Sequence, residues 1–237
     1  MSGPASSPSD PAPVRLYLDT ADRAAAEDLL GTGLFAGLTT NPTILRRAGR
    51  GVADLADIHR WAVGAGAREV FLQSWGDDTA TLVERGLRLR ALGEEVVVKL
   101  VASRAGAAAC ATLAGRGVPT LLTAVYDPVQ AVVAAAAGAT YIAPYLGKLA
   151  EAGRDALGDV TAMQEVLAAT GSPTRILLAS LRDAASIATL ARRGVTHFTM
   201  GPPIAEQMFA DELTAQAVQA FEDAVREGEG EDAHAGR

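Results

Sequence analysis

The chain has 237 residues, of which 49% are hydrophobic, 21% charged and 5% aromatic, and its formal net charge is −7. This length suits one domain with a large core. The low aromatic content and the lack of a basic surplus argue against nucleic-acid binding. No apolar run reaches the roughly 18 residues that span a bilayer, so we expect no membrane partner. The single cysteine, Cys110, rules out an intramolecular disulfide, fits a cytoplasmic protein and is predicted to be a buried structural thiol.

The two ends of the chain differ in composition from its body. Residues 1–13 are rich in Ser, Pro and Ala but have neither a cationic start nor an apolar stretch, so they predict a flexible extension rather than a signal peptide. A charge of −4 is concentrated in residues 222–237, and residues 227–237 are predicted as a disordered acidic tail. Residues 14–226 are left as the catalytic domain.

Short apolar runs alternate with longer helical segments throughout that domain. Strands are predicted at 16–19, 35–40, 69–74, 95–101, 119–124, 141–145, 175–180 and 197–200. Helices are predicted at 21–30, 52–64, 79–91, 104–115, 128–137, 149–169, 184–193 and 204–221. Eight βα units in which strands such as VVVKLV are apolar on both faces predict an α/β fold, a single (β/α)₈ TIM barrel with a C-terminal helix extension. An open doubly wound sheet is the alternative, but LYLDTAD lacks the glycine-rich loop such a sheet normally carries after its first strand.

Active residues of a barrel lie where its strands end and on the loops that come next. Polar side chains gather at these positions, where a strand would otherwise be apolar. They are Asp19, Thr39, Thr40, Asn41, Gln73, Lys99, Thr123, Tyr145, Ser180 and Arg182.

Lys99 is the most informative of them. The chain has 19 arginines and only two lysines, and three valines precede this one. Burial disfavours the ammonium form, lowers the lysine pKa and makes the amine a nucleophile for carbonyls. Two other interpretations stay open from the residues alone, namely a structural ion pair with Asp19 and a phosphate-binding lysine.

The neighbouring polar residues have structural as well as functional interpretations. Asp19 could bind a substrate hydroxyl or cap the next helix, which Thr20 or Asp22 could cap as well. The Thr39–Pro42 segment could form a hydrogen-bonding wall or only a turn. Gln73 is neutral, so it could position a water but could not take a proton.

Other chemistries find little support. The three histidines are scattered and there is no Cys/His cluster, so we expect no metal site. Neither a P-loop nor a G-x-S-x-G motif is present, and no cofactor is expected. Ser180 and Arg182 come after the seventh strand, the usual phosphate position in barrels, and Arg182 offers a bidentate donor. A solvated arginine at a helix start is the alternative for Arg182.

Taken together, the segments LYLDTAD, GLTTNPTIL, VVVKL, TLLTAVYDPVQA, APYLGKL and LLASLRD resemble the transaldolase and fructose-6-phosphate aldolase family, in family order. The resemblance covers the whole domain and implies a class I mechanism. Lys99 would form an iminium with a ketose or ketose phosphate and retain a dihydroxyacetone unit as an enamine. Asp19, Asn41 and Thr39 would hold the hydroxyl groups of that unit.

The resemblance also bears on the fate of the enamine. Transaldolases typically have a glutamate where this chain has Gln73, and a phenylalanine where it has Tyr145. Gln73, Thr123 and Tyr145 look like the aldolase branch, in which the three hold a water and the tyrosine tunes its proton transfer. Lys148 stands where the family usually has an arginine.

Three functional alternatives therefore remain. The first is an aldolase that cleaves or transfers a dihydroxyacetone unit, and the second is a transaldolase of the pentose phosphate pathway. Ala143 stands where transaldolases tend to have Ser, whereas Arg182 matches a phosphate arginine of transaldolases. The third alternative is a non-catalytic barrel that binds a sugar phosphate. A cytoplasmic homo-oligomer joined through the last helix is expected from the resemblance alone.

Overall fold

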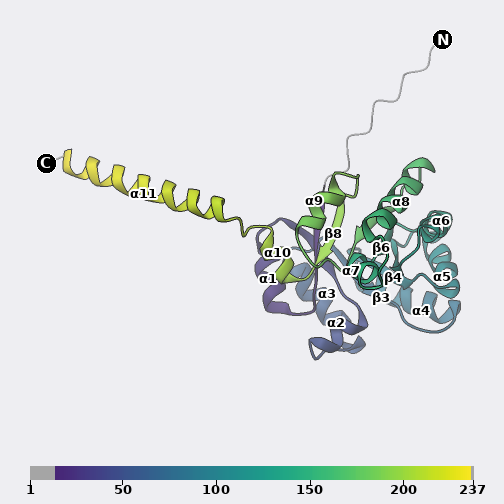
Figure 1. The fold of residues 1–237 in the computed structure, drawn as a ribbon. Helices are drawn as coiled ribbons and strands as arrows, with labels where there is room; N and C mark the ends of the chain where they lie inside the picture. Colours follow the sequence, from purple (N-terminus) through teal and green to yellow (C-terminus); the bar gives the residue numbers. More distant parts are fainter. Residues whose placement is uncertain (1–13, 236–237) are drawn as a thin grey trace, which may run out of the picture.

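The computed structural model describes residues 14–235, so the N-terminal extension predicted at residues 1–13 lies outside the described residues. Eight parallel strands form one closed barrel in sequence order, with helices around it (Figure 1). The strands are β1 (Arg15–Asp19), β2 (Phe35–Thr39), β3 (Glu69–Gln73), β4 (Val96–Val101), β5 (Thr120–Val125), β6 (Tyr141–Pro144), β7 (Arg175–Leu178) and β8 (His197–Met200). The predicted TIM barrel is confirmed, and the open sheet is excluded because β1 pairs with β8.

The helices differ from the prediction mainly because some predicted helices are split in two. They are α1 (Arg23–Gly31), α2 (Pro42–Arg47), α3 (Leu55–Gly64), α4 (Thr79–Arg90), α5 (Arg104–Ala114), α6 (Val129–Ala136), α7 (Leu146–Glu151), α8 (Ala156–Ala169), α9 (Ala185–Ala191), α10 (Pro202–Gln207) and α11 (Glu212–Ala235), with a 3₁₀ turn, η1 (Val52–Asp54). Two predicted helices, at 149–169 and 204–221, are each replaced by a pair. The short helix α2 has no counterpart among the predictions.

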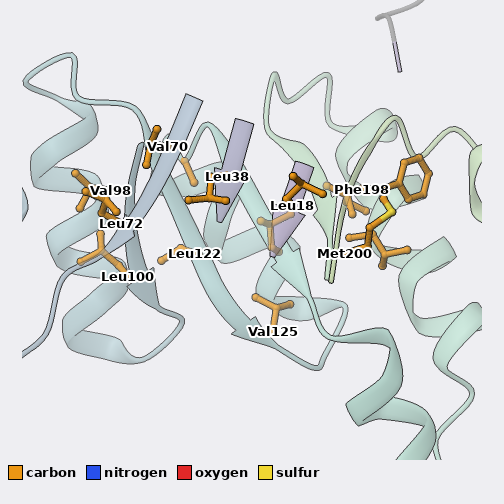
Figure 2. Packing of buried hydrophobic residues seen from close by; sticks show 14 of the residues in the cluster. Leu18, Leu38, Val70, Leu72, Val98, Leu100, Leu122, Val125, Phe198 and Met200 are labelled. Atoms are coloured by element: carbon orange, nitrogen blue, oxygen red, sulfur yellow. The ribbon is translucent and has the colours of Figure 1, made fainter. Parts of the chain in front are cut away.

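Two apolar clusters pack on the two sides of the barrel wall. The outer cluster joins strand residues to the covering helices, and Figure 2 shows its members on the strands, among them Leu18, Leu38 and Val98. The inner cluster draws only on strands and the loop after β7, and includes Tyr17, Phe71 and Val97. Since successive strand residues face opposite sides, one apolar run supplies both clusters. Cys110 is buried in the outer cluster, as predicted.

A polar group closes the amino-terminal end of the barrel. Glu69 accepts hydrogen bonds from Tyr17 Oη at 2.5 Å and Tyr141 Oη at 2.7 Å, and Arg15 Nη1 lies 3.3 Å from its carboxylate. His197 packs against both tyrosine rings, with centroids at 6.2 and 5.6 Å. This group lies at the end opposite to where barrel enzymes carry their active sites, and we interpret it as stabilising the barrel.

His197 makes the stability of the barrel sensitive to acid. Burial, helped by the charges of Arg175 and Arg15, lowers its pKa from 6.5 to about 4. Between these values the unfolded chain binds a proton that the folded chain does not. The free energy of unfolding should therefore fall as pH falls from about 6.5 to about 4. Urea unfolding across this range should show a flatter pH dependence for His197→Gln, and an unchanged slope would assign the effect to other groups.

The C-terminal helix α11 extends away from the barrel (Figure 1). Residues 227–235, predicted as disordered, are helical in the structure, while residues 236–237 lie outside the described part. Glu and Ala within residues 227–235 favour helix, and the turns before this segment are held where Asp223 accepts from Gln219 at 2.9 Å and Arg226 at 3.0 Å. The helix exposes Leu213 and Phe221, which are 74% and 70% exposed.

Candidate active site

A cavity of about 440 Å³ opens at the carboxyl ends of the strands. The residues singled out for catalysis or binding line it, although they come from different strands, β1 to β7, or from the segments after them. They are Asp19, Thr39, Asn41, Gln73, Lys99, Thr123, Tyr145, Lys148, Ser180 and Arg182. Thr40 is the exception, because its buried hydroxyl is directed to the Phe71 carbonyl instead. Their roles remain predictions, but their placement in one cavity is explained by parallel strands ending at the same edge of the barrel.

Lys99 projects into this cavity from β4. The flanking Val98 and Leu100 belong to the outer cluster, so strand alternation directs Lys99 inward. Its side chain is buried, and Nζ donates a hydrogen bond to the Thr40 carbonyl at 2.7 Å. Among the described residues, Lys99 forms no ion pair with Asp19 within 4.0 Å. The direct ion pair considered from the sequence is therefore not formed, although Asp19 is near enough for its charge to act on Lys99.

The charges of Lys99 and Asp19 are shifted toward neutrality by the same cause. Burial lowers the pKa of the Lys99 ammonium, and the Asp19 carboxylate opposes this shift only in part. Burial raises the pKa of Asp19, against the effects of Lys99 and a hydrogen bond from Thr39. A larger share of Lys99 is consequently the free amine at neutral pH than for a lysine in water, as a carbonyl nucleophile requires.

A line of hydroxyl groups fixes the Asp19 carboxylate. Thr39 Oγ1 donates to Asp19 Oδ1 at 2.6 Å and is itself 2.7 Å from Thr199 Oγ1. Capping of α1 falls to Asp22, whose Oδ1 accepts from the amides of Ala24 and Ala25. The helix cap therefore does not explain Asp19, which is held at the cavity wall instead.

Asn41 combines the two roles that the sequence left open. Its Oδ1 accepts from the amides of Thr43 and Ile44 at 3.0 Å and so caps α2, with Pro42 in the first turn. The residue also lines the cavity. Because Oδ1 is used by the cap, its amide NH₂ is the group left to donate to a substrate hydroxyl.

A phenol and a hydroxyl meet in the cavity where β5 and β6 end. Tyr145 Oη lies 2.8 Å from Thr123 Oγ1. Burial raises the Tyr145 pKa, against a hydrogen bond with Thr123, so the phenol stays protonated near neutral pH. The next residue after Thr123, Ala124, has a left-handed backbone with φ of 58°, where the register of β5 and β6 shifts. Backbone strain of this kind gathers at functional sites.

Gln73 completes this part of the cavity wall. It ends β3, and its Cα is paired with that of Lys99 in the β3–β4 register. An uncharged amide therefore stands beside the Lys99 amine at the cavity wall. It can donate to and accept from a water, but it cannot exchange a proton with one.

A cluster of charges lies at the outer end of the cavity. Lys148 and Arg182 both line it and both bind Glu151, with N–O distances of 2.5 Å and 2.6 Å. Ser180 lies beside them with φ of 59°. The guanidinium of Arg182 thus forms an ion pair at the cavity and is also 55% exposed, so its phosphate-binding role stays a prediction.

Close contact at Gly147 holds this cluster together. The Gly147 amide donates to the Ser180 carbonyl at 2.8 Å, and a Cβ at Gly147 would lie 2.5 Å from that oxygen and 3.0 Å from Arg182 Nε. We expect Gly147→Ala to cost about 1–3 kcal/mol of stability and to raise KM for a phosphorylated substrate roughly tenfold. Steady-state kinetics with Gly64→Ala, where a Cβ meets open space, provide the control. Equal effects on phosphorylated and unphosphorylated substrates would contradict the prediction.

Thr199 and Arg47 also line the cavity, although neither was predicted from the sequence. Thr199 lies inside β8, and its signal is a hydroxyl between Phe198 and Met200 of the outer cluster, which places it on the inner face. Arg47 ends α2 and lines the cavity with an exposed side chain. No periodic signal distinguishes it from the adjacent Arg46, because only the path of α2 brings it to the cavity.

Comparison with known proteins concerns the same domain. The profile of the transaldolase/fructose-6-phosphate aldolase family matches residues 16–235. The chain belongs to this family. A probable transaldolase of Coprothermobacter proteolyticus is 35% identical over 213 residues, covering 88% of this chain and 94% of the relative. A probable transaldolase of Caulobacter sp. strain K31 is 33% identical, with the same two coverages.

The side chains of this transaldolase-family enzyme were also compared with the requirements of a metal site and of a membrane span. Within residues 14–235, no three His, Cys, Asp or Glu side chains gather in a way that could hold a metal ion. None of the helices in that same part of the chain is long and apolar enough to cross a membrane. The polar groups of the cavity are an amine, carboxyl, amide and hydroxyl set, joined by a cationic outer end.

Proposed function

We propose that this protein is a class I enzyme that cleaves or transfers the dihydroxyacetone unit of a ketose through a Schiff base on Lys99. The observation that carries the proposal is Lys99 itself. It is a buried amine with a lowered pKa, hydrogen-bonded to a backbone carbonyl and facing the cavity. Membership of the transaldolase/fructose-6-phosphate aldolase family supports the same reaction class.

The bond changes are those of an iminium. Lys99 Nζ attacks the C2 carbonyl carbon of the ketose, and the carbonyl oxygen leaves as water. A water held by Gln73, Thr123 and Tyr145 takes the proton of the C4 hydroxyl, and this group later returns it to C3 of the enamine or to the new hydroxyl formed from the acceptor aldehyde. The C3–C4 bond then breaks, an aldehyde leaves, and the electron pair moves into the iminium to give an enamine. The hydroxyl groups of the retained unit are held by Asp19, Asn41 and the Thr39 wall.

The fate of the enamine separates two activities. Protonation at C3 followed by hydrolysis completes an aldolase reaction, whereas addition to a second aldehyde completes a transaldolase reaction. The protonated phenol of Tyr145 and the uncharged Gln73 favour the aldolase outcome. The cationic outer end of the cavity and the relatives named probable transaldolase favour the second.

The same outer end indicates a phosphorylated substrate. Lys148 and Arg182 offer charge and a bidentate donor, and Ser180 offers a hydroxyl beside them. A ketose phosphate whose carbonyl reaches Lys99 would place its phosphate toward these residues. No cofactor takes part in the proposed reaction.

Reductive trapping tests the proposal directly. The enzyme is treated with borohydride in the presence of fructose 6-phosphate or dihydroxyacetone, and the adduct is mapped by mass spectrometry. An adduct on Lys99 is expected, and its absence with every ketose would leave only a sugar-phosphate-binding barrel. Formation of sedoheptulose 7-phosphate from fructose 6-phosphate and erythrose 4-phosphate would assign the transaldolase outcome.

We also propose that the enzyme is a cytoplasmic homo-oligomer. Support comes from α11, which extends from the barrel and exposes Leu213, Phe221 and Val225. Burial of such side chains by a neighbouring copy lowers the free energy and so favours assembly. Analytical ultracentrifugation of the full chain and of a variant shortened before α11 measures whether the assembly depends on this helix.

A further inference from the structure

Lys148 of α7 and Arg182 of the loop after β7, at the outer end of the cavity, share one carboxylate. Glu151, at the end of α7, accepts from Lys148 Nζ at 2.5 Å through Oε2. Its Oε1 accepts from Arg182 Nη2 at 2.6 Å and from Arg182 Nε at 3.2 Å. Both carboxylate oxygens are thus engaged by the groups that would bind a substrate phosphate.

This arrangement changes the charge that a ligand meets. Two cations and one carboxylate leave one net positive charge where Lys148 and Arg182 alone would supply two. The hydrogen bonds from Lys148 and Arg182 lower the Glu151 pKa to about 2, so the carboxylate is ionised throughout the physiological range. Glu151 therefore carries its negative charge beside Lys148 and Arg182 at any physiological pH.

We propose that Glu151 is an internal competitor for the phosphate site, which occupies Lys148 and Arg182 in the free enzyme and is displaced by the substrate's phosphate. This proposal rests on the proposed function of the cavity, and it adds a residue that sets how strongly and how selectively the site takes anions.

The competition favours a phosphate over weaker anions. A phosphate ester carries about −1.5 to −2 charges and three acceptor oxygens, whereas Glu151 offers one charge and two oxygens. A phosphate therefore replaces both contacts of Glu151, while a singly charged or neutral group gains little by displacing it. The side chain of Glu151 is 48% exposed, so it can move into solvent when displaced.

A positioning role for Glu151 predicts the opposite result. If the carboxylate only held Lys148 and Arg182 in the right geometry, its removal would loosen both cations and weaken phosphate binding. The sign of the change on removing the charge therefore decides between competition and positioning.

The experiment compares wild type with Glu151→Gln in the direction of bond formation. Dihydroxyacetone is the donor, and glyceraldehyde 3-phosphate and glyceraldehyde are acceptors that differ only in the phosphate. We expect Glu151→Gln to lower KM for the phosphorylated acceptor about threefold to tenfold, with no change for glyceraldehyde and little change in kcat. This gain should shrink as ionic strength rises, because the groups are exposed.

Glu84→Gln is the matched control, because Glu84 is an exposed glutamate paired with Arg88 on α4, outside the cavity. It makes the same change in net charge and should leave both KM values as in wild type. Glu151→Asp keeps the charge but shortens the side chain, and should fall between wild type and Glu151→Gln. A raised or unchanged KM for the phosphorylated acceptor in Glu151→Gln would overturn the proposal.

Calorimetric titration with inorganic phosphate separates this inference from the proposed function. Phosphate should bind Glu151→Gln about threefold to tenfold more tightly than wild type, whether or not any ketose reacts. Tighter phosphate binding without a Lys99 adduct would sustain the role of Glu151 and reject the Schiff-base reaction. A Lys99 adduct together with unaltered phosphate binding in Glu151→Gln would support the Schiff-base reaction and reject the role of Glu151.

Discussion

Lys99→Met is expected to reduce carbon–carbon bond cleavage on the order of 10⁴-fold or more and to abolish the borohydride adduct. No other lysine can take the role at this position, since the chain has only one further lysine, Lys148, at the exposed outer end of the cavity. Ketose cleavage measured with a coupled assay, together with mass mapping of the trapped protein, checks the result.

The same variant should fold normally. Among residues 14–235, no carboxylate lies within 4.0 Å of the buried Lys99 ammonium, so a methionine of similar length removes a cost of desolvation rather than an ion pair. The free energy of unfolding should be unchanged or higher than in wild type. Lys148→Met is the matched control and should keep the adduct on Lys99. Trapping on Lys148 in the Lys99→Met protein would contradict the assignment.

The lowered pKa of Lys99 has its own kinetic signature. The reactive form is the free amine, so kcat/KM should rise with pH and reach half its limit below the ordinary lysine value of 10.5. Asp19 acts against this shift, because its negative charge favours the ammonium. Asp19→Asn should therefore move the midpoint to lower pH.

Tyr145→Phe is expected to slow protonation of the enamine by about 10²-fold or more, while the adduct on Lys99 still forms. The variant removes the phenol that bonds Thr123 Oγ1 at 2.8 Å and keeps the ring. With protonation impaired, a larger share of the enamine should be captured by an aldehyde, so products should move from aldolase toward transaldolase. Exchange of the dihydroxyacetone protons with deuterated solvent measures the protonation step alone.

Tyr126→Phe is the control for this change. Tyr126 packs edge-on against Tyr145, with ring centroids 5.8 Å apart, and is partly exposed, so it tests the effect of losing a nearby phenol. Thr123→Val should act in the same direction as Tyr145→Phe but less strongly, because the phenol remains. Full exchange activity in Tyr145→Phe would assign proton transfer to another group of the cavity.

The barrel could be predicted because each of its strands carries a local signal. The run around VVVKLV is apolar on both faces, and it is confirmed as β4 with Val98 outside and Lys99 inside. Polar residues at strand ends were correctly expected in one place, because parallel strands closing in sequence order bring their carboxyl ends together. Membership of the family was likewise predicted, from motifs that follow one another along the chain in the same order as in the family.

Local signals failed where two interpretations share one pattern. A helical period continues from 204 to 221, yet the chain breaks between α10 and α11. The acidic composition of residues 227–235 indicated disorder, but the same glutamates and alanines also favour a helix. Composition fits both outcomes for residues 227–235, because the residues that carry the acidic surplus also favour helix.

Lys99 illustrates which features can be predicted from the local sequence pattern and which depend on the folded structure. The amino-acid sequence is enough to place a lone lysine in an apolar strand of a barrel, near the polar ends of other strands. Folding alone settles that its amine meets the Thr40 carbonyl rather than Asp19, and that Glu151 joins Lys148 to Arg182. The physical reason is range: strand and helix patterns arise from neighbours along the chain, whereas charges and hydrogen bonds depend on distances between segments that only folding brings together.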